Sequence, residues 1–201
     1  AGLVATTGTN NVLLGGLAAD SLTTGSHNVV VGYNALATED AHGRNIAIGT
    51  NALTAQDAGA DAYNIAIGHN TGLAMTTGIY NTLIGGMAGD ALTTGQYNVA
   101  LGHEALSTED TGGRNIAIGY QALRNANYDG NAYNIALGFG AGTAVTTGQG
   151  NTLLGSLAGY NLQAGNNNVA IGMQALENED AHGYNVAVGN EALQTLNAGA
   201  H

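Results

Sequence analysis

Asn45-Ile46-Ala47-Ile48-Gly49 is the stretch that decides the fold, because variants of it recur along the chain. Each variant has Asn, three residues that are apolar or begin with Thr, and then Gly. The spacings between successive copies are 17, 17, 19 and 17, and the same order begins again at Asn81, which defines a 70-residue superrepeat. Such regular self-similarity is typical of a stacked repeat architecture. The eleven copies begin at Asn11, Asn28, Asn45, Asn64, Asn81, Asn98, Asn115, Asn134, Asn151, Asn168 and Asn185.

Each copy predicts one short β-strand, since its three residues are rich in β-branched types and its Gly can take the positive φ of a corner. The segments between copies are polar and rich in turn residues, and their glycines interrupt any helical period. We therefore expect an all-β fold, a parallel β-solenoid of about eleven coils that forms one domain over residues 1–201. At about 4.8 Å per coil the rod is roughly 50 Å long.

The asparagines that begin the copies predict a structural ladder. Identical spacing places all eleven at one corner of the solenoid. An Asn amide both donates and accepts, so each one can bind the next coil and satisfy backbone groups at the corner.

The middle residue of each copy is never polar, and this predicts an oligomer interface. Side chains alternate along a strand, so the middle residue faces away from its two neighbours. We expect one sheet face to be covered by the rest of its own coil and the middle-position face to be covered by identical chains, in a threefold rod. The predicted interface residues are Leu13, Val30, Ala47, Ala66, Leu83, Ala100, Ala117, Ala136, Leu153, Ala170 and Ala187.

The composition excludes several classes of partner. Only 3 residues are Lys or Arg, against 14 Asp plus Glu, and the net charge is −11. Nucleic acids and anionic membranes are bound through clustered Lys and Arg, so we expect neither as a partner. The sequence contains no run of about 18 apolar residues, so it does not predict a membrane-spanning helix. The chain has no Cys, which excludes thiolate metal sites and Cys nucleophiles.

Three carboxylate pairs occur at equivalent places, one in each superrepeat: Glu39-Asp40, Glu109-Asp110 and Glu179-Asp180. Catalysis needs unlike groups converging at one site, whereas these pairs form three similar loops. We expect solvated loop charges, so that Glu109→Gln has little effect, with no catalytic residue, no metal and no cofactor. Binding of Ca²⁺ remains an alternative, because carboxylates are its usual ligands.

The two loops that make some coils longer than the rest, residues 54–63 and 124–133, are either ordinary exposed loops or candidate ligand-binding loops. Loops on a rigid scaffold often carry binding function. Their aromatic and polar side chains suit a sugar, and the candidates are Tyr63, Tyr128, Asp129 and Tyr133.

Residues 45–49, 64–68 and 168–172 (NIAIG, NIAIG and NVAIG) resemble the YadA-like head repeats of trimeric autotransporter adhesins. Together with Tyr33-Asn34-Ala35-Leu36 and Tyr120-Gln121-Ala122-Leu123, they also resemble repeats of phage tail fibres. The resemblance implies a left-handed parallel β-roll with three chains per fibre. It also implies an extracellular location, on a cell surface or a virion, and attachment to a cell-surface glycan or a protein receptor.

These observations favour a structural and adhesive segment of a trimeric fibre. Because the first and last residues align with the interior of other coils, we expect the segment to belong to a longer fibre. The alternative is a module that binds carbohydrate or Ca²⁺ within its coils. A third hypothesis is a left-handed β-helix acyltransferase, which would carry an aliphatic residue every six positions, whereas apolar triplets occur here only once per coil.

Overall fold

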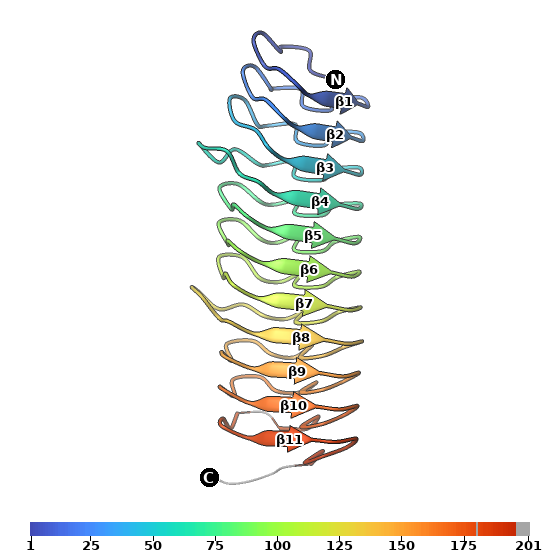
Figure 1. Ribbon diagram of the computed structural model, residues 1–201, viewed down its shortest axis with the longest axis vertical. Helices are drawn as coiled ribbons and strands as arrows, with labels where there is room; N and C mark the ends of the chain where they lie inside the picture. Colours follow the sequence, from blue (N-terminus) through green and yellow to red (C-terminus); the bar gives the residue numbers. More distant parts are fainter. Residues whose placement is uncertain (180, 196–201) are drawn as a thin grey trace.

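A computed structural model describes residues 1–179 and 181–195, so Asp180 of the third carboxylate pair lies outside the described residues. The chain winds into a rod in which each coil contributes one strand to a single parallel sheet, ordered β1 to β11 along the chain (Figure 1). The predicted all-β parallel solenoid is confirmed. The strands are β1 (Val12–Leu14), β2 (Val29–Val31), β3 (Ile46–Ile48), β4 (Ile65–Ile67), β5 (Thr82–Ile84), β6 (Val99–Leu101), β7 (Ile116–Ile118), β8 (Ile135–Leu137), β9 (Thr152–Leu154), β10 (Val169–Ile171) and β11 (Val186–Val188).

Strand register is the same in every coil, whatever the length of the coil. Ile46 pairs with Ile65 across a longer coil just as Val99 pairs with Ile116 across a shorter one. The extra residues are therefore taken up by the loops after β3 and β7, which project from the rod (Figure 1). Insertions of this kind are tolerated because the strands that carry the stacking are unchanged.

The ladder asparagines stack through their side chains. In each of ten steps, Oδ1 of one ladder Asn accepts a hydrogen bond from the backbone N–H of the next, at 2.8 to 3.2 Å. Several Nδ2 groups also donate to a backbone carbonyl of the following coil, such as Asn81 to the Gly95 carbonyl at 2.9 Å. The corner thus satisfies its backbone groups without water.

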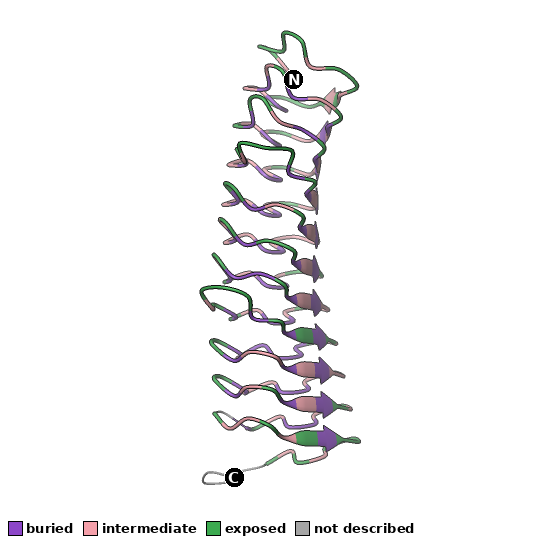
Figure 2. Cartoon of the chain, turned by 60° about the vertical axis from the view of Figure 1, so that its left-hand side comes forward, coloured by how far each residue is buried: buried purple, intermediate pink, exposed green. Residues whose placement is uncertain are grey.

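The middle-position residues line the interior of the coil, and the prediction that they form an oligomer interface is wrong. Strand alternation separated the two faces correctly but did not say which face turns inward. Ala35 and Leu36, from another part of the coil, belong to the same buried core. In β2 to β11 the middle residue is buried, whereas its two neighbours in the strand are half-buried or exposed (Figure 2). Buried within the single chain are Val30, Ala47, Ala66, Leu83, Ala100, Ala117, Ala136, Leu153, Ala170 and Ala187, with Leu13 partly buried.

This interior combines a few large middle residues with many small ones. Leu83 is one of the few large middle residues, and glycines in two coils make room for it. A Cβ on Gly72 would lie 3.1 Å from Leu83 Cδ1, and a Cβ on Gly89 would lie 3.1 Å from Leu83 Cδ2. The same arrangement recurs one superrepeat later, around Leu153. Complementary volumes of this kind give the interior its close packing.

The first carboxylate of each pair, Glu39, Glu109 or Glu179, is buried, so the prediction that these groups are solvated is wrong. Each occupies the same place relative to its ladder Asn, a position where other coils carry a buried Leu such as Leu92. This position faces the interior of the coil whether it carries Glu or Leu. The buried carboxylate is held by a short turn, in which Glu109 Oε1 accepts a hydrogen bond from the Gly112 N–H at 2.8 Å.

Candidate functional site

The residue that precedes each ladder Asn is in the left-handed region of φ in every described coil. Tyr63, Tyr80 and Tyr97, for example, have φ of 52°, 59° and 59°. This conformation is uncommon for residues other than Gly, and here it turns the side chain outward at the same place in each coil. The column consists of Asn10, His27, Arg44, Tyr63, Tyr80, Tyr97, Arg114, Tyr133, Gly150, Asn167 and Tyr184.

Six successive members of this column, from Arg44 to Tyr133, form a continuous stack that we call the aromatic ladder. The ring centroids of Tyr63 and Tyr80 are 5.5 Å apart, and those of Tyr80 and Tyr97 are 5.2 Å apart, with nearly parallel planes. The inter-coil spacing of about 4.8 Å places the rings at stacking distance. The ladder therefore follows from the repeat itself.

Arginines continue the stack at both ends of the tyrosine run. The Arg44 guanidinium carbon lies 5.5 Å from the Tyr63 ring centroid, and that of Arg114 lies 5.0 Å from Tyr97 and 5.8 Å from Tyr133. These distances are within the range of cation–π attraction. The ladder thus alternates flat apolar surface with positive charge on a chain whose net charge is −11.

Arg114 differs from the other two arginines because it has no carboxylate partner among the described residues. Arg44 Nε donates to Asp61 Oδ2 at 2.7 Å, and the hydrogen bond from Arg44 lowers the pKa of that carboxyl group. Arg124 Nε lies 2.9 Å from Glu104 Oε2. Arg114 keeps its five N–H donors available for an anionic or polar ligand.

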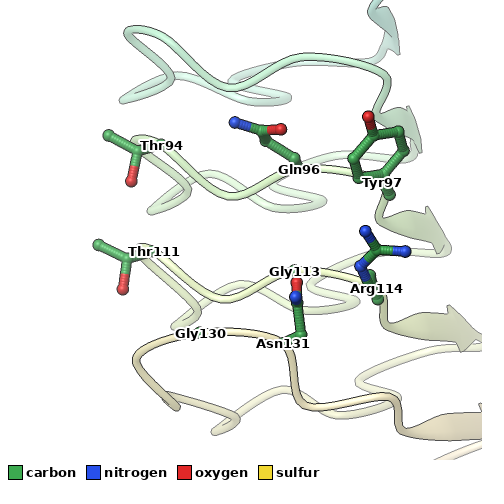
Figure 3. Close-up of a pocket in the computed structure, with 8 residues that line it drawn as sticks. All are labelled: Thr94, Gln96, Tyr97, Thr111, Gly113, Arg114, Gly130 and Asn131. Atoms are coloured by element: carbon green, nitrogen blue, oxygen red, sulfur yellow. The ribbon is translucent and has the colours of Figure 1, made fainter.

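A groove of about 260 Å³ opens beside Arg114 (Figure 3). Tyr97 and Arg114 lie at the end of the groove nearer the strands (Figure 3). The hydroxyls of Thr94 and Thr111 lie at the other end. The amides of Gln96 and Asn131 lie between them. An aromatic face, a guanidinium, amides and hydroxyls together can stack against a sugar ring and bind its oxygens. The groove is lined by Thr94, Gln96, Tyr97, Thr111, Gly113, Arg114, Gly130 and Asn131.

A second groove, of about 370 Å³, lies where the aromatic column is interrupted. Gly150 and Asn167 occupy the column between Tyr133 and Tyr184, so no ring fills this space. Both tyrosines border the groove, and Gln149 adds a further amide to its lining. The two grooves therefore share one composition: tyrosine with amide side chains.

The structure brings together only part of the predicted ligand site. Tyr63 and Tyr133 belong to the aromatic ladder but stand four coils apart. Tyr128 is half-buried, and Asp129 Oδ1 accepts a hydrogen bond from the Thr111 hydroxyl at 2.9 Å. Neither lines a groove, whereas the neighbouring loop residues Gly130 and Asn131 do.

Sequence reasoning missed Tyr97, Arg114 and Gln96 at the first groove. A signal was present, because the residue before the ladder Asn is Tyr or Arg in seven of the eleven copies. Because these residues recur at the same spacing as the ladder asparagines, the column predicts a stack of exposed flat side chains.

Neither described segment of the chain, 1–179 or 181–195, contains a helix long and apolar enough to span a membrane. Comparison of the sequence and structure with protein-family models, curated proteins and solved structures finds no match.

Proposed function

We propose that this chain is a structural and adhesive segment of a homotrimeric extracellular or viral fibre. The observation that carries the proposal is the outer face of the sheet, formed by the first and third residue of each strand. No strand contains a charged residue, and apart from Thr82 and Thr152 this face is entirely aliphatic. Its most exposed members are Val12, Leu14, Leu101, Ile135, Leu137, Ile171, Val186 and Val188.

A continuous apolar stripe of this length is unusual on a soluble surface and is typical of an interaction site. The fitting partner is another copy of the same chain. The stripe repeats once per coil, at about 4.8 Å, so only a surface with the same repeat can interdigitate with it along its whole length. Three copies around one axis would cover each stripe, in the left-handed roll that the family resemblance implies.

The loops and the exposed carboxylates, such as Asp40, would then face outward, where the net charge of −11 keeps such fibres apart. The grooves beside the aromatic ladder offer weak contacts to a surface receptor. Repetition over three chains would multiply these contacts into a much higher avidity. No catalytic step is part of this proposal.

The oligomeric proposal is tested by measuring the molar mass in solution with light scattering. We expect three times the chain mass of 20.0 kDa. Ile118→Asp places a charge on the stripe and should yield monomers that retain the circular dichroism spectrum of the wild type. The matched control Asn125→Asp places a charge on an exposed loop residue and should remain trimeric. A monomeric wild-type chain, or a trimeric Ile118→Asp variant, would contradict the proposal.

A second candidate function, binding of an acidic glycan, is favoured by the unpaired guanidinium of Arg114 in a groove with Tyr97. Arginine binds carboxylates in a bidentate manner, and tyrosine stacks on sugar rings. A glycan array should show retention of sialylated or uronate-containing glycans by the wild type. Arg114→Gln should abolish that retention, whereas Arg124→Gln, which removes a paired arginine, should not. Equal retention by both variants would refute this candidate.

A further inference from the structure

The loop after β2 and the loop after β3 meet at a cluster of metal-ligating side chains. Glu39, Asp40 and His42 come from the first loop, and Asp57 comes from the second. One ligand atom from each of the four lies within 4.8 Å of the others. The cluster therefore bridges two consecutive coils, close in sequence to Arg44 of the aromatic ladder, and none of its residues lines either groove.

Glu39, the buried member of this cluster, has one unsatisfied carboxylate oxygen. Its side chain is fully buried, and Oε1 accepts a hydrogen bond from the His42 N–H at 3.0 Å. Oε2 is also buried and makes no hydrogen bond. Burial raises the pKa of Glu39, and the amides of His42 and Ala58 offset this only in part. A buried carboxylate oxygen without a partner is costly unless a cation or a donor satisfies it.

His42 has a similar unsatisfied atom. Its Nδ1 is buried, makes no hydrogen bond, and lies 3.5 Å from Glu39 Oε1. Backbone contacts hold the other two ligands in place: the Asp57 N–H donates to the Thr76 carbonyl at 2.8 Å, and the Asp40 carbonyl accepts from the Thr23 N–H at 2.6 Å. The four side chains thus project from anchored positions.

Comparison between the superrepeats shows that the cluster is more than a feature of the scaffold. In the second superrepeat, Glu109 and Asp110 are kept, but His42 is matched by Gly112 and Asp57 by Asn127. In the third, Asp57 is matched by Asn197. The buried glutamate with an unsatisfied Oε2 recurs in all three superrepeats, whereas the histidine together with the second-coil aspartate occurs only in the first.

We propose that Glu39, Asp40, His42 and Asp57 bind one divalent transition-metal ion of the zinc type. One imidazole nitrogen and three carboxylate oxygens suit four-coordinate Zn²⁺, whose ligands lie at about 2.0–2.2 Å from the metal and so about 3.4 Å from each other. The observed cluster reaches this geometry by a small contraction of its exposed side chains. Ca²⁺ instead takes six to eight oxygens at longer distances, and an imidazole ligand favours Zn²⁺ over Ca²⁺.

The ion would act as a staple between two coils. It would satisfy the buried Glu39 oxygen, neutralise part of the local negative charge, and tie the coil of β2 to that of β3. Because the ion binds the folded chain, its binding free energy adds to stability. The second superrepeat stacks without the full set, so the ion stabilises this part of the rod without being required for the fold.

The test is calorimetric titration of the full chain with ZnCl₂ alone and, separately, with CaCl₂. We expect one Zn²⁺ per chain and an increase in melting temperature, with binding of Ca²⁺ at least about 10-fold weaker. His42→Gly and Asp57→Asn should each weaken Zn²⁺ binding by about 10-fold or more. Both variants install the residue found at the same position of the second superrepeat, so both should fold, and melting of the metal-free proteins checks this.

His182→Ala is the matched control. His182 is the counterpart of His42 in the third superrepeat and contacts Glu179 at 2.7 Å, but that superrepeat lacks the second-coil aspartate. Its replacement should leave Zn²⁺ binding unchanged. The proposal is overturned if the wild type does not bind Zn²⁺, if Ca²⁺ binds as tightly, if folded His42→Gly and Asp57→Asn bind like the wild type, or if His182→Ala weakens binding equally.

Discussion

Asn98 Oδ1 accepts a hydrogen bond from the backbone N–H of Asn115 at 3.0 Å, while Asn98 Nδ2 donates to the Gly112 carbonyl at 2.9 Å. One buried side chain thus joins its own coil to the next at two points. Because the same contact recurs along the rod, the ladder acts as a continuous hydrogen-bonded spine.

Asn98→Ala should destabilise the chain by roughly 2–6 kcal/mol, because two buried backbone groups lose their partners at about 1–3 kcal/mol each. Urea denaturation measures this change. Asn161→Ala is the control, since Asn161 Nδ2 makes an exposed contact with Asn178 Oδ1 at 2.9 Å. The control should change stability by less than about 0.5 kcal/mol. If both variants lost a similar free energy of unfolding, the ladder Asn would contribute no more to stability than an exposed contact does.

Gly102→Ala should destabilise the chain by at least about 2 kcal/mol. Gly102 has φ of +140°, and an added Cβ would lie 2.3 Å from the Gly119 carbonyl oxygen. Gly59→Ala is a matched control, because Gly59 also has positive φ, +67°, but faces open space. Its cost should be limited to backbone strain of about 1 kcal/mol. Thermal melting separates the two, and equal shifts would contradict the close approach of the coils.

Ala117→Asp should reduce folding stability, whereas Ile118→Asp should reduce association, although the two residues are adjacent. Ala117 is fully buried inside the coil, so a charge there lacks solvent and a partner, and the chain should lose several kcal/mol of stability. Ile118 lies on the outer face, where a charge should change association but leave each chain folded. Circular dichroism melting distinguishes loss of fold from loss of assembly. A stable Ala117→Asp variant would mean that the inward face is assigned wrongly.

Glu109→Gln should stabilise the chain at pH 7 and not at pH 4. Burial raises the pKa of Glu109, so the folded chain holds this proton more tightly than the unfolded chain does. The stability contributed by Glu109 is therefore fully present below the ordinary pKa of 4.5 and is lost as the pH rises through the raised value. Glutamine stays neutral and already occurs three residues after a buried Leu in a longer coil, as Glu109 does in its own coil, and there Gln56 Oε1 accepts a hydrogen bond from Asn64 Nδ2 at 3.0 Å.

Melting temperatures of wild type and Glu109→Gln across pH 4 to pH 8 test this linkage. Glu191→Gln is the control, because Glu191 is exposed. Its melting curve should follow the wild type at every pH. A Glu109→Gln variant that is less stable than the wild type at pH 7 would contradict the assigned direction of the pKa shift.

The sequence alone determined the number of coils, their parallel stacking and the ladder corner. These features depend on the spacing between successive ladder asparagines. Because the spacing is regular, only one strand register stacks every Asn on an Asn and every Gly on a Gly. The same column analysis could have revealed the aromatic ladder, since Tyr80 and Tyr97 precede ladder asparagines in the way that Arg114 does.

Only the tertiary structure decided which face of the strand turns inward. Alternation places Ala117 opposite Ile116 and Ile118, but both faces are apolar, so hydropathy cannot choose between them. The choice depends on which face the rest of the coil closes over, and that face carries Ala at seven of the eleven middle positions. The same enclosure buries Glu39 in a column of leucines and brings it against Asp57 of the following coil, because a coil closes on itself and a linear pattern does not.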